Sequence, residues 1–389
     1  MRNIRVIFVA VFFQNWIFAY AIERIFWESR SMSVQDVVLT EFVFIAAILA
    51  LEIPAGIVAD RYPRKTVLIC AALAQVVEFV VVALATTFAQ FAVAVAIAAL
   101  AQSLTSGTFN AIVYDSLDRE GASAAFPKVL GRIEAFDNLT VVAALTAGGF
   151  VAERTALVNL YWLGAAASAI AMLVLAGLSE PVRGRRNEPA SHPIAVLKSS
   201  LALLKQRPSL RAIVVAGVCI AGSIVYLDEF MTLYLRDNHL PIWSFGVVLG
   251  AVYVFRSIGS LVGDRMVVLT GHRWFVPAAV LVFLVLQIVF GVVGIWPALA
   301  ISGVLYLLWG AIDVVRAAVL HDAAEDAFRA TAESVVSQVE QVVSLGFGLL
   351  FSVFARRGGI AAAVALTAAC AAAAYLGYCL LDRRARRTP

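Results

Sequence analysis

Acidic residues inside long apolar runs are the side chains of this sequence best suited to chemistry. Asp228 and Glu229 are adjacent in one run, and Glu23 and Glu52 lie in two others. An ionisable group inside a bilayer is costly and is a functional candidate by default. Neighbours on a helix point about 100° apart, so we expect at least one of Asp228 and Glu229 to face protein rather than lipid.

Structural explanations stay open for two of these acids. Glu23 is followed by Arg24, and the tips of both side chains can reach water at the membrane surface. Glu52 lies two residues before Pro54, where it either braces a bend in a helix or titrates. The sequence is compatible with both roles of Glu52.

No enzyme constellation accompanies these acids. The four histidines fall in separate loops: His192, His239, His272 and His321. There is no His-Glu-x-x-His, Gly-x-Ser-x-Gly or phosphate-binding glycine loop. All four cysteines fall within apolar runs, where free cysteine behaves as a small hydrophobe. We therefore expect no enzyme activity, no metal site and no cofactor.

Membrane helices must position the acids. Of the 389 residues 62% are hydrophobic and 14% charged, against about 25% charged in a soluble domain, and the mean hydropathy is +0.90. Apolar runs of ~20 residues, long enough to cross ~30 Å of hydrocarbon, recur along the chain. They lack the alternation of barrel strands, so we predict an all-α membrane protein. Twelve spans are expected: Ile4–Phe26, Val37–Val58, Thr66–Thr86, Phe91–Tyr114, Val129–Val151, Ala156–Leu178, Leu210–Leu235, Ile242–Val262, Trp274–Gly294, Pro297–Leu320, Thr331–Phe354 and Ile360–Leu381.

The longest loop divides the spans into six and six. Residues 179–209 hold four prolines with several Lys and Arg, a composition typical of a linker. We expect one six-helix bundle over 1–178 and a second over 210–389. Two parallel halves of this kind imply a central cleft.

Basic residues predict the orientation of the chain. With the N-terminus in the cytoplasm, 22 of the 30 Lys and Arg fall on the cytoplasmic side, 5 on the outer side and 3 within spans. We therefore expect a plasma-membrane protein with both termini cytoplasmic. No basic run interleaves with aromatic residues for base stacking, so the net charge of +4 does not indicate nucleic-acid binding.

A charged turn follows the second span on that side. It reads Gly56-Ile57-Val58-Ala59-Asp60-Arg61-Tyr62-Pro63-Arg64-Lys65. Gly56 permits close helix approach, and Asp60 beside a helix N-terminus would contribute a few tenths to ~1 kcal/mol. The three cations of the turn can bind acidic partners or anionic headgroups. Asp115, at the end of the fourth span, is a candidate partner, and Asp264-Arg265 after the eighth span echoes Asp60-Arg61.

This turn resembles the signature of the major facilitator superfamily. The pattern Gly-x-x-x-Asp-Arg-x-x-Arg-Lys is matched at Gly56, Asp60, Arg61, Arg64 and Lys65, with Pro63 where Gly is usual. Three further runs resemble those of bacterial members: Glu52-Ile53-Pro54-Ala55, Tyr114-Asp115-Ser116-Leu117 and Gly131-Arg132. The resemblance covers the whole chain. It implies two six-helix pseudo-repeats and secondary transport by alternating access.

Two signatures of exporters in this family are absent. The fourth span has no Arg in Leu100–Gly107, where many proton-coupled drug exporters carry one. The fifth span keeps the glycines of Gly-Pro-x-x-Gly-Gly in Thr146-Ala147-Gly148-Gly149 but lacks the proline. Both departures weaken an assignment as a multidrug antiporter.

The resemblance also implies roles for particular residues. Asp60 would contact the start of the eleventh span near Thr331, and the turn with Asp115, Asp264 and Arg265 would latch the cytoplasmic side closed. The alternative is that these charges only fix topology. Spans 1, 4, 7 and 10 would line the cleft, where a poorly solvated Asp228, Glu229 or Glu23 could carry a proton. Glu52, in the second span, is a further candidate for proton coupling.

The same four spans supply candidate substrate contacts. They are Gln14, Trp16, Tyr20, Asn110, Tyr226, Phe230, Trp309, Asp313 and Arg316. Any of the aromatic residues could instead be ordinary packing. Asp313 and Arg316, three residues apart on one helix face, could simply neutralise each other.

These features predict a secondary transporter that exports a small amphipathic organic molecule in exchange for protons. Its expected partners are that substrate, protons and the bilayer, and we expect a monomer. The alternative is proton-coupled or facilitative uptake of a small metabolite. A non-transporting receptor or scaffold on the same fold is a more remote alternative.

Overall fold

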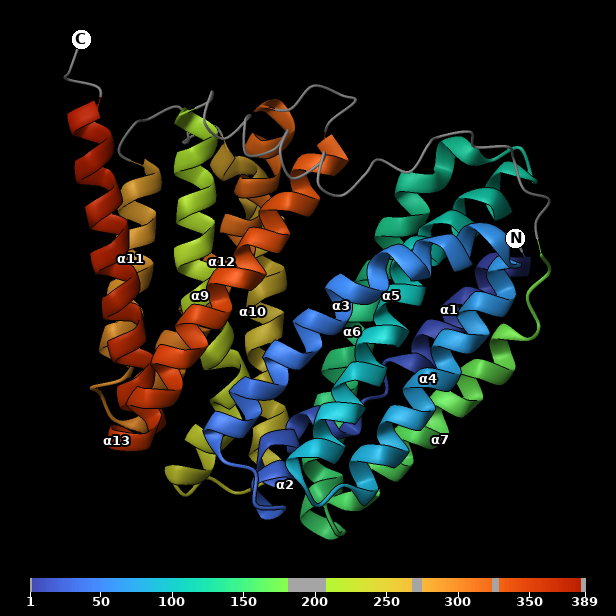
Figure 1. The fold of residues 1–389 in the computed structure, drawn as a ribbon, viewed down its shortest axis with the longest axis horizontal. Helices are drawn as coiled ribbons and strands as arrows, with labels where there is room; N and C mark the ends of the chain where they lie inside the picture. Colours follow the sequence, from blue (N-terminus) through green and yellow to red (C-terminus); the bar gives the residue numbers. More distant parts are fainter. Residues whose placement is uncertain (1, 181–207, 268–274, 324–328, 386–389) are drawn as a thin grey trace. The chain divides into compact units, whose positions relative to one another are not determined.

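The chain folds as two compact units of membrane helices (Figure 1). The computed structural model describes residues 2–180, 208–267, 275–323 and 329–385, and every regular element in these ranges is a helix. Unit 1 comprises residues 1–187 and 240–250, and unit 2 comprises residues 188–239 and 251–389. The linker expected at 179–209 therefore lies mostly outside the described residues.

Unit 1 is built from long helices with well-formed starts. Its elements are α1 (Arg2–Gln14), η1 (Phe18–Ala21), α2 (Glu23–Ser29), α3 (Val34–Arg61), α4 (Arg64–Leu84), α5 (Phe88–Asp118), η2 (Ser123–Ala125), α6 (Phe126–Arg154) and α7 (Val158–Leu175). Ser33 and Asp36 form a capping box at α3, and Thr87 and Gln90 form one at α5. These caps satisfy backbone N–H groups where the helices begin.

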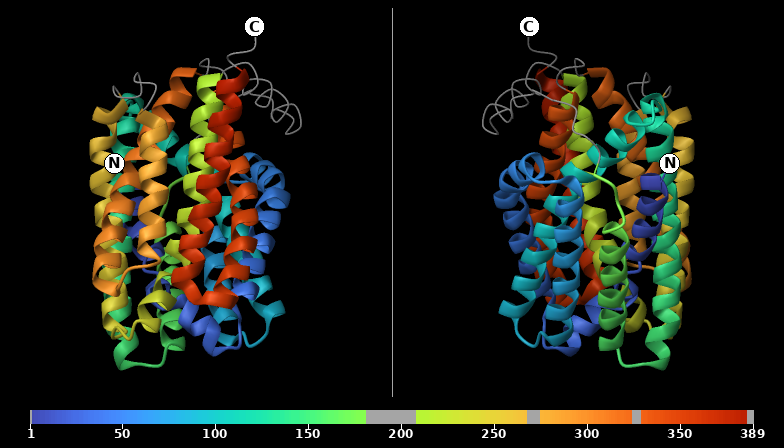
Figure 2. Two further views of the ribbon diagram at one scale, coloured as in Figure 1. Left: turned by 90° about the vertical axis from the view of Figure 1, so that its left-hand side faces the viewer. Right: turned by 90° about the vertical axis from the view of Figure 1, so that its right-hand side faces the viewer.

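Unit 2 packs α9 against three other helices. Its elements are α9 (Pro208–Asp237), the part of α10 (Trp243–Val267) beyond Gly250, α11 (Phe275–Phe290), α12 (Ile295–Ala323) and α13 (Arg329–Ala385). Contacts join α9 to α11, α12 and α13, and Figure 2 (left) shows this group face on.

Helix α13 accounts for two of the predicted spans. Its 57 residues, at about 1.5 Å each, would far exceed the ~30 Å thickness of the hydrocarbon core. Gly359, at φ 77°, interrupts the helical geometry, and the orange and red arms meet there at a bend (Figure 1). Ten described helices are long and apolar enough to span a membrane, and α11 is a shorter apolar helix. With α13 taken as two arms, the twelve predicted spans are accounted for.

The first predicted span, Ile4–Phe26, is not one continuous helix, which corrects the prediction. Helix α1 ends at Gln14, η1 covers Phe18–Ala21, and α2 begins only at Glu23. The side-chain amide of Asn15 donates a hydrogen bond to the carboxylate of Asp137 on α6. Asp137 on α6 thus holds Asn15 in place at the point where α1 ends.

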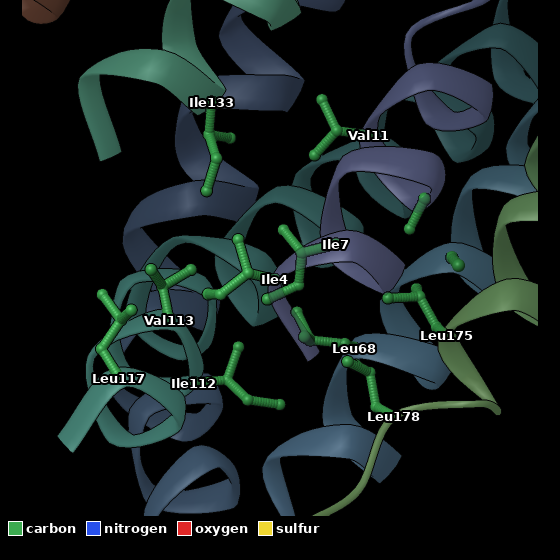
Figure 3. Close-up of a cluster of buried hydrophobic side chains, with 12 residues drawn as sticks. Ile4, Ile7, Val11, Leu68, Ile112, Val113, Leu117, Ile133, Leu175 and Leu178 are labelled. Atoms are coloured by element: carbon green, nitrogen blue, oxygen red, sulfur yellow. The ribbon is translucent and has the colours of Figure 1, made fainter. Parts of the chain in front are cut away.

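A cluster of buried aliphatic side chains holds α1 in place within unit 1 (Figure 3). Ile4, Ile7 and Val11 of α1 contact side chains from α4, α5, α6 and the end of α7. The partners are Leu68, Ile112, Val113, Leu117, Ile133, Leu175 and Leu178. The cluster ends at Val11, so the polar residues that follow it are held at a defined depth beside α4 and α6.

Close backbone approach in unit 1 occurs at Gly148, and the prediction for Gly56 is wrong. A Cβ at Gly148 would collide with the backbone carbonyl of Phe18 in η1. A Cβ at Gly56 would meet nothing within 4 Å. The turn glycine is exposed at the end of α3, whereas the glycine of α6 makes room for the broken first span.

Candidate functional site

A cavity of about 510 Å³ opens within unit 1 beside the broken first span. Small-molecule sites typically measure ~300–1,000 Å³. Its polar lining residues are Gln14, Asn15, Tyr20, Glu23, Gln75, Glu78, Gln102, Thr105, Ser106, Asn110, Glu134, Asp137 and Tyr161. Its apolar lining residues are Val11, Ile17, Ala19, Phe44, Phe79, Ala98, Ala101, Phe109, Leu130 and Ile133. The cavity is therefore amphipathic and large enough for a small organic molecule.

The charged side chains in the cavity wall all have the same sign. Four carboxylates line it, from Glu23, Glu78, Glu134 and Asp137, and no Lys, Arg or His is among the described lining residues. Arg24, the residue after Glu23, instead pairs with Glu41 at 3.6 Å and lies over the ring of Trp27 at 4.6 Å. The cavity wall is thus acidic, and the guanidinium of Arg24 forms its ion pair with Glu41.

Hydrogen bonds hold the broken first span against the cavity wall. Gln75 on α4 donates from Nε2 to the backbone carbonyl of Gln14 at 3.3 Å, where α1 ends. Trp27 on α2 donates from Nε1 to the hydroxyl of Tyr161 on α7 at 3.0 Å. With the bond from Asn15 to Asp137, these contacts fix both sides of the break.

Four residues singled out from the sequence line this cavity, and one does not. Gln14, Tyr20, Glu23 and Asn110 are in its wall. Trp16 is not, because its ring packs against Phe12 and Phe18 at centroid distances of 5.5 and 4.9 Å. Its role as a substrate contact in the central cleft stays a prediction.

Sequence reasoning missed several lining residues. Glu78, Glu134 and Asp137 are ionisable residues inside apolar runs, so the signal that selected Glu23 also applied to them. Gln102 and Thr105 carry no comparable signal, since polar uncharged residues are common inside membrane helices. Only the packing of α5 against α3 and α4 brings them to the cavity.

In unit 2, Asp228 is held by two tyrosines. Its carboxylate accepts hydrogen bonds from the hydroxyls of Tyr253 at 3.0 Å and of Tyr306. These three residues come from α9, α10 and α12, so three helices converge on one carboxylate. Glu229, the next residue, is half-buried and faces a different direction on α9.

A chain of charges links α10, α12 and α13 in unit 2. Arg256 contacts Asp313 at 3.1 Å and lies 3.8 Å above the ring of Trp309. Arg316 lies 3.7 Å from Asp313 and donates to both carboxylate oxygens of Glu340 at 2.9 Å. Asp313 and Arg316 therefore do not only neutralise each other within α12. They belong to a network of four charged residues that also includes Arg256 and Glu340.

Tyr226 and Phe230 are packing residues, which corrects their selection as cleft residues. Both are buried, and their rings stack on Phe351 of α13 at centroid distances of 5.5 and 5.0 Å. The hydroxyl of Tyr226 donates to the backbone carbonyl of Ser344 at 2.9 Å. Four residues apart, the two rings share one face of α9, and α13 covers that face.

The charged turn after α3 contacts α5 and Glu180, which follows α7. Arg64 forms an ion pair with Asp115 and donates to the carbonyl of Ala111 at 2.7 Å. The carboxylate of Glu180 accepts from the backbone N–H groups of Arg64 and Lys65 at 2.8 and 2.9 Å. Glu180 thereby caps the start of α4.

The other residues that the sequence singled out in or near the two turns are exposed or lie outside the described residues. Arg61 and Arg265 are exposed at the ends of α3 and α10, and Glu52 is exposed on α3. The side chains of Asp60 and Asp264 lie outside the described residues. So does the start of the eleventh predicted span, the expected partner of Asp60.

Comparison with known proteins identifies the family. The model of the major facilitator superfamily matches residues 6–267. Among solved structures, the chain is similar to a bacterial homologue of the human lysosomal transporter Spinster in an inward-facing, unoccupied conformation. The two sequences are 14% identical, the TM-score is 0.72, and the match covers 97% of this chain and 94% of that one. It is similar to the nucleoside transporter NupG at 15% identity and a TM-score of 0.73, and the match covers 97% of this chain and 99% of that one. It is also similar to the peptide transporter POT in complex with sulfate, at 13% identity and a TM-score of 0.69, and this match covers 98% of this chain and 94% of that one. Among curated proteins no sequence matches. The chain belongs to the major facilitator superfamily.

Proposed function

We propose that the chain is a proton-coupled exporter of a small amphipathic organic molecule and works by alternating access. Membership of a family of secondary transporters supports transport itself. The observation that carries the proposal is the cavity in unit 1, whose wall combines aromatic rings, amides and carboxylates. Such a mixture suits a ligand with both an apolar body and a polar group.

Proton coupling is proposed to involve an acid in each unit. Asp228, where α9, α10 and α12 converge, is the first candidate in unit 2, with Glu229 beside it. Glu23, in the cavity wall, is the first candidate in unit 1, with the exposed Glu52 as the alternative. Ionisable groups at membrane depth commonly mark proton pathways.

The turn between α3 and α4 is proposed to act as a conformational latch in the cytoplasm. Its ion pair between Arg64 and Asp115 and its contact with Glu180 support the proposal, since they tie the turn to two other segments of unit 1. The excess of Lys and Arg on one side of the predicted topology supports a plasma-membrane protein with both termini cytoplasmic.

Proton flux in liposomes tests the proposal. The purified full chain is reconstituted with a pH-sensitive dye inside, and a panel of cationic and neutral amphipathic molecules is added outside. At least one molecule is expected to move protons in wild-type vesicles, and Asp228→Asn is expected to abolish this flux while exchange of labelled for unlabelled substrate continues. Asp237→Asn, at the exposed end of the same helix, is the control and should behave as wild type.

Two results would contradict the proposal. Substrate movement without any proton flux would exclude proton coupling, and no movement of any compound would remove the support for transport of amphipathic molecules. The direction is measured in cells that lack the chain. An exporter predicts that such cells accumulate more substrate, whereas lower accumulation would favour the uptake alternative.

A further inference from the structure

We infer that the cavity of unit 1 is a binding site for an organic cation with an aromatic or aliphatic body. This inference rests on the proposed transport function and adds the charge of the substrate. It follows from three properties of the cavity wall: its unpaired carboxylates, its aromatic rings and a buried amide oxygen that accepts no hydrogen bond.

The four acids of the cavity wall form no ion pair among the described residues. Within the part of the chain that the structure describes, Glu23, Glu78 and Glu134 form no hydrogen bond and no ion pair, and only Asp137 has a partner, the amide of Asn15. Carboxylates in membrane-spanning segments usually pair with one another or with cations. A positively charged ligand would supply the charge that the cavity wall does not contain.

The remaining wall suits the body of such a ligand. Phe44, Phe79, Phe109 and Tyr20 surround the same space from four different elements. Aromatic faces attract cations and provide apolar contact area at the same time. An inorganic cation would gain little from these rings, and an anion would find no cationic side chain among the described lining residues.

Gln75 provides an independent indication of a ligand. Its Nε2 donates to the carbonyl of Gln14, but its Oε1 is buried and has no hydrogen-bond partner among the described residues. Gln75 lines the cavity, and a buried acceptor without a donor carries a desolvation cost. The oxygen has almost no accessible surface in the observed rotamer, so the Gln75 side chain would rotate to present it to a polar hydrogen of a bound ligand.

A pair of probes with equal shape and opposite charge tests the inference. Tetraphenylphosphonium and tetraphenylborate are each equilibrated by dialysis with the purified full chain in detergent, and binding to protein-free micelles is subtracted. Wild type is expected to bind the cation saturably and at least tenfold more tightly than the anion. Glu23→Gln and Glu78→Gln are each expected to weaken cation binding about tenfold, which corresponds to ~1.4 kcal/mol.

The matched control is Glu153→Gln, an exposed acid near the end of α6 that does not line the cavity. It should bind the cation as wild type does. The inference is overturned if the two probes bind equally, or if the cation does not bind saturably. It is also overturned if neither Glu23→Gln nor Glu78→Gln weakens binding of the cation. The comparison of the two probes on wild type requires no variant to fold.

Failure of this inference is distinguishable from failure of the transport proposal. If the cation binds with the expected preference but no compound moves protons in liposomes, the site stands and the transport proposal fails. If neutral or anionic compounds are transported while the cation does not bind, transport stands and the inferred charge of the substrate is wrong.

Discussion

Breaking the ion pair between Arg316 and Glu340 is expected to destabilise unit 2 measurably. Arg316 donates to both carboxylate oxygens at 2.9 Å, and the two side chains are 26% and 13% exposed. Two unit charges ~4 Å apart at an effective dielectric constant of about 20 attract by ~4 kcal/mol. Glu340→Met removes this attraction together with the desolvation cost of the Glu340 carboxylate, and Asp313, 3.7 Å from Arg316, keeps the guanidinium paired, so we expect a net loss of about 2 kcal/mol.

Thermal unfolding of the detergent-purified full chain measures this loss. A destabilisation of about 2 kcal/mol should lower the Tm by about 2–4 °C in a chain of this size. The control is Asp237→Asn, which breaks the exposed pair of Arg236 and Asp237, whose side chains are 40% and 45% exposed. Exposed pairs are worth ~0–1 kcal/mol, so its Tm should change by less than about 1 °C.

A second variant separates charge from packing. In the double variant Arg316→Met with Glu340→Met neither charge remains, and replacing a buried ion pair by apolar side chains is often neutral. The double variant should therefore regain most of the Tm that Glu340→Met loses. The reasoning is refuted if Glu340→Met and Asp237→Asn have the same Tm, or if the double variant is less stable than Glu340→Met.

Three further predictions concern the glycines, the tyrosine cluster and the turn. Gly148→Ala should lower the yield of monodisperse protein in size-exclusion chromatography, because its Cβ meets a backbone carbonyl of η1, whereas Gly56→Ala should not; equal yields would contradict the close approach. Tyr306→Phe removes one hydrogen bond to Asp228 and should cost about 1 kcal/mol of stability, seen as a lower Tm; an unchanged Tm would show that this bond contributes nothing. Arg64→Ala should cut transport several-fold at an unchanged amount of protein in the membrane, and undiminished transport would contradict a latch that depends on this ion pair.

Hydropathy predicted the membrane helices well because burial in lipid depends on local sequence. The span expected at Thr66–Thr86 is observed as α4 over Arg64–Leu84, and the other unbroken spans agree similarly. The break after Gln14 was missed because no proline or glycine marks it. The contact observed at the break, the bond from Asn15 to Asp137, joins residues more than a hundred positions apart in the sequence.

The candidate site was predicted less completely because a sequence does not show which face of an apolar helix meets protein. Tyr226 and Phe230 were selected because an aromatic residue in the seventh span could face a cleft, but that face of α9 packs on Phe351. Glu23 was found because a charge in an apolar run is conspicuous. Other uncharged cavity residues, such as Gln102 and Thr105, became visible only when five or more elements were assembled around one space.

Protection of a cavity residue by substrate tests most directly whether the cavity of unit 1 holds the transported molecule. Thr105→Cys, in a chain whose four native cysteines are replaced by alanine, places a thiol in the cavity wall, and Glu153→Cys places one outside it. The rate of alkylation by a water-soluble maleimide is measured in liposomes with and without the transported compound. The account predicts that substrate slows labelling at position 105 in proportion to its occupancy and leaves labelling at position 153 unchanged. Equal labelling of the cavity thiol with and without saturating substrate would contradict it.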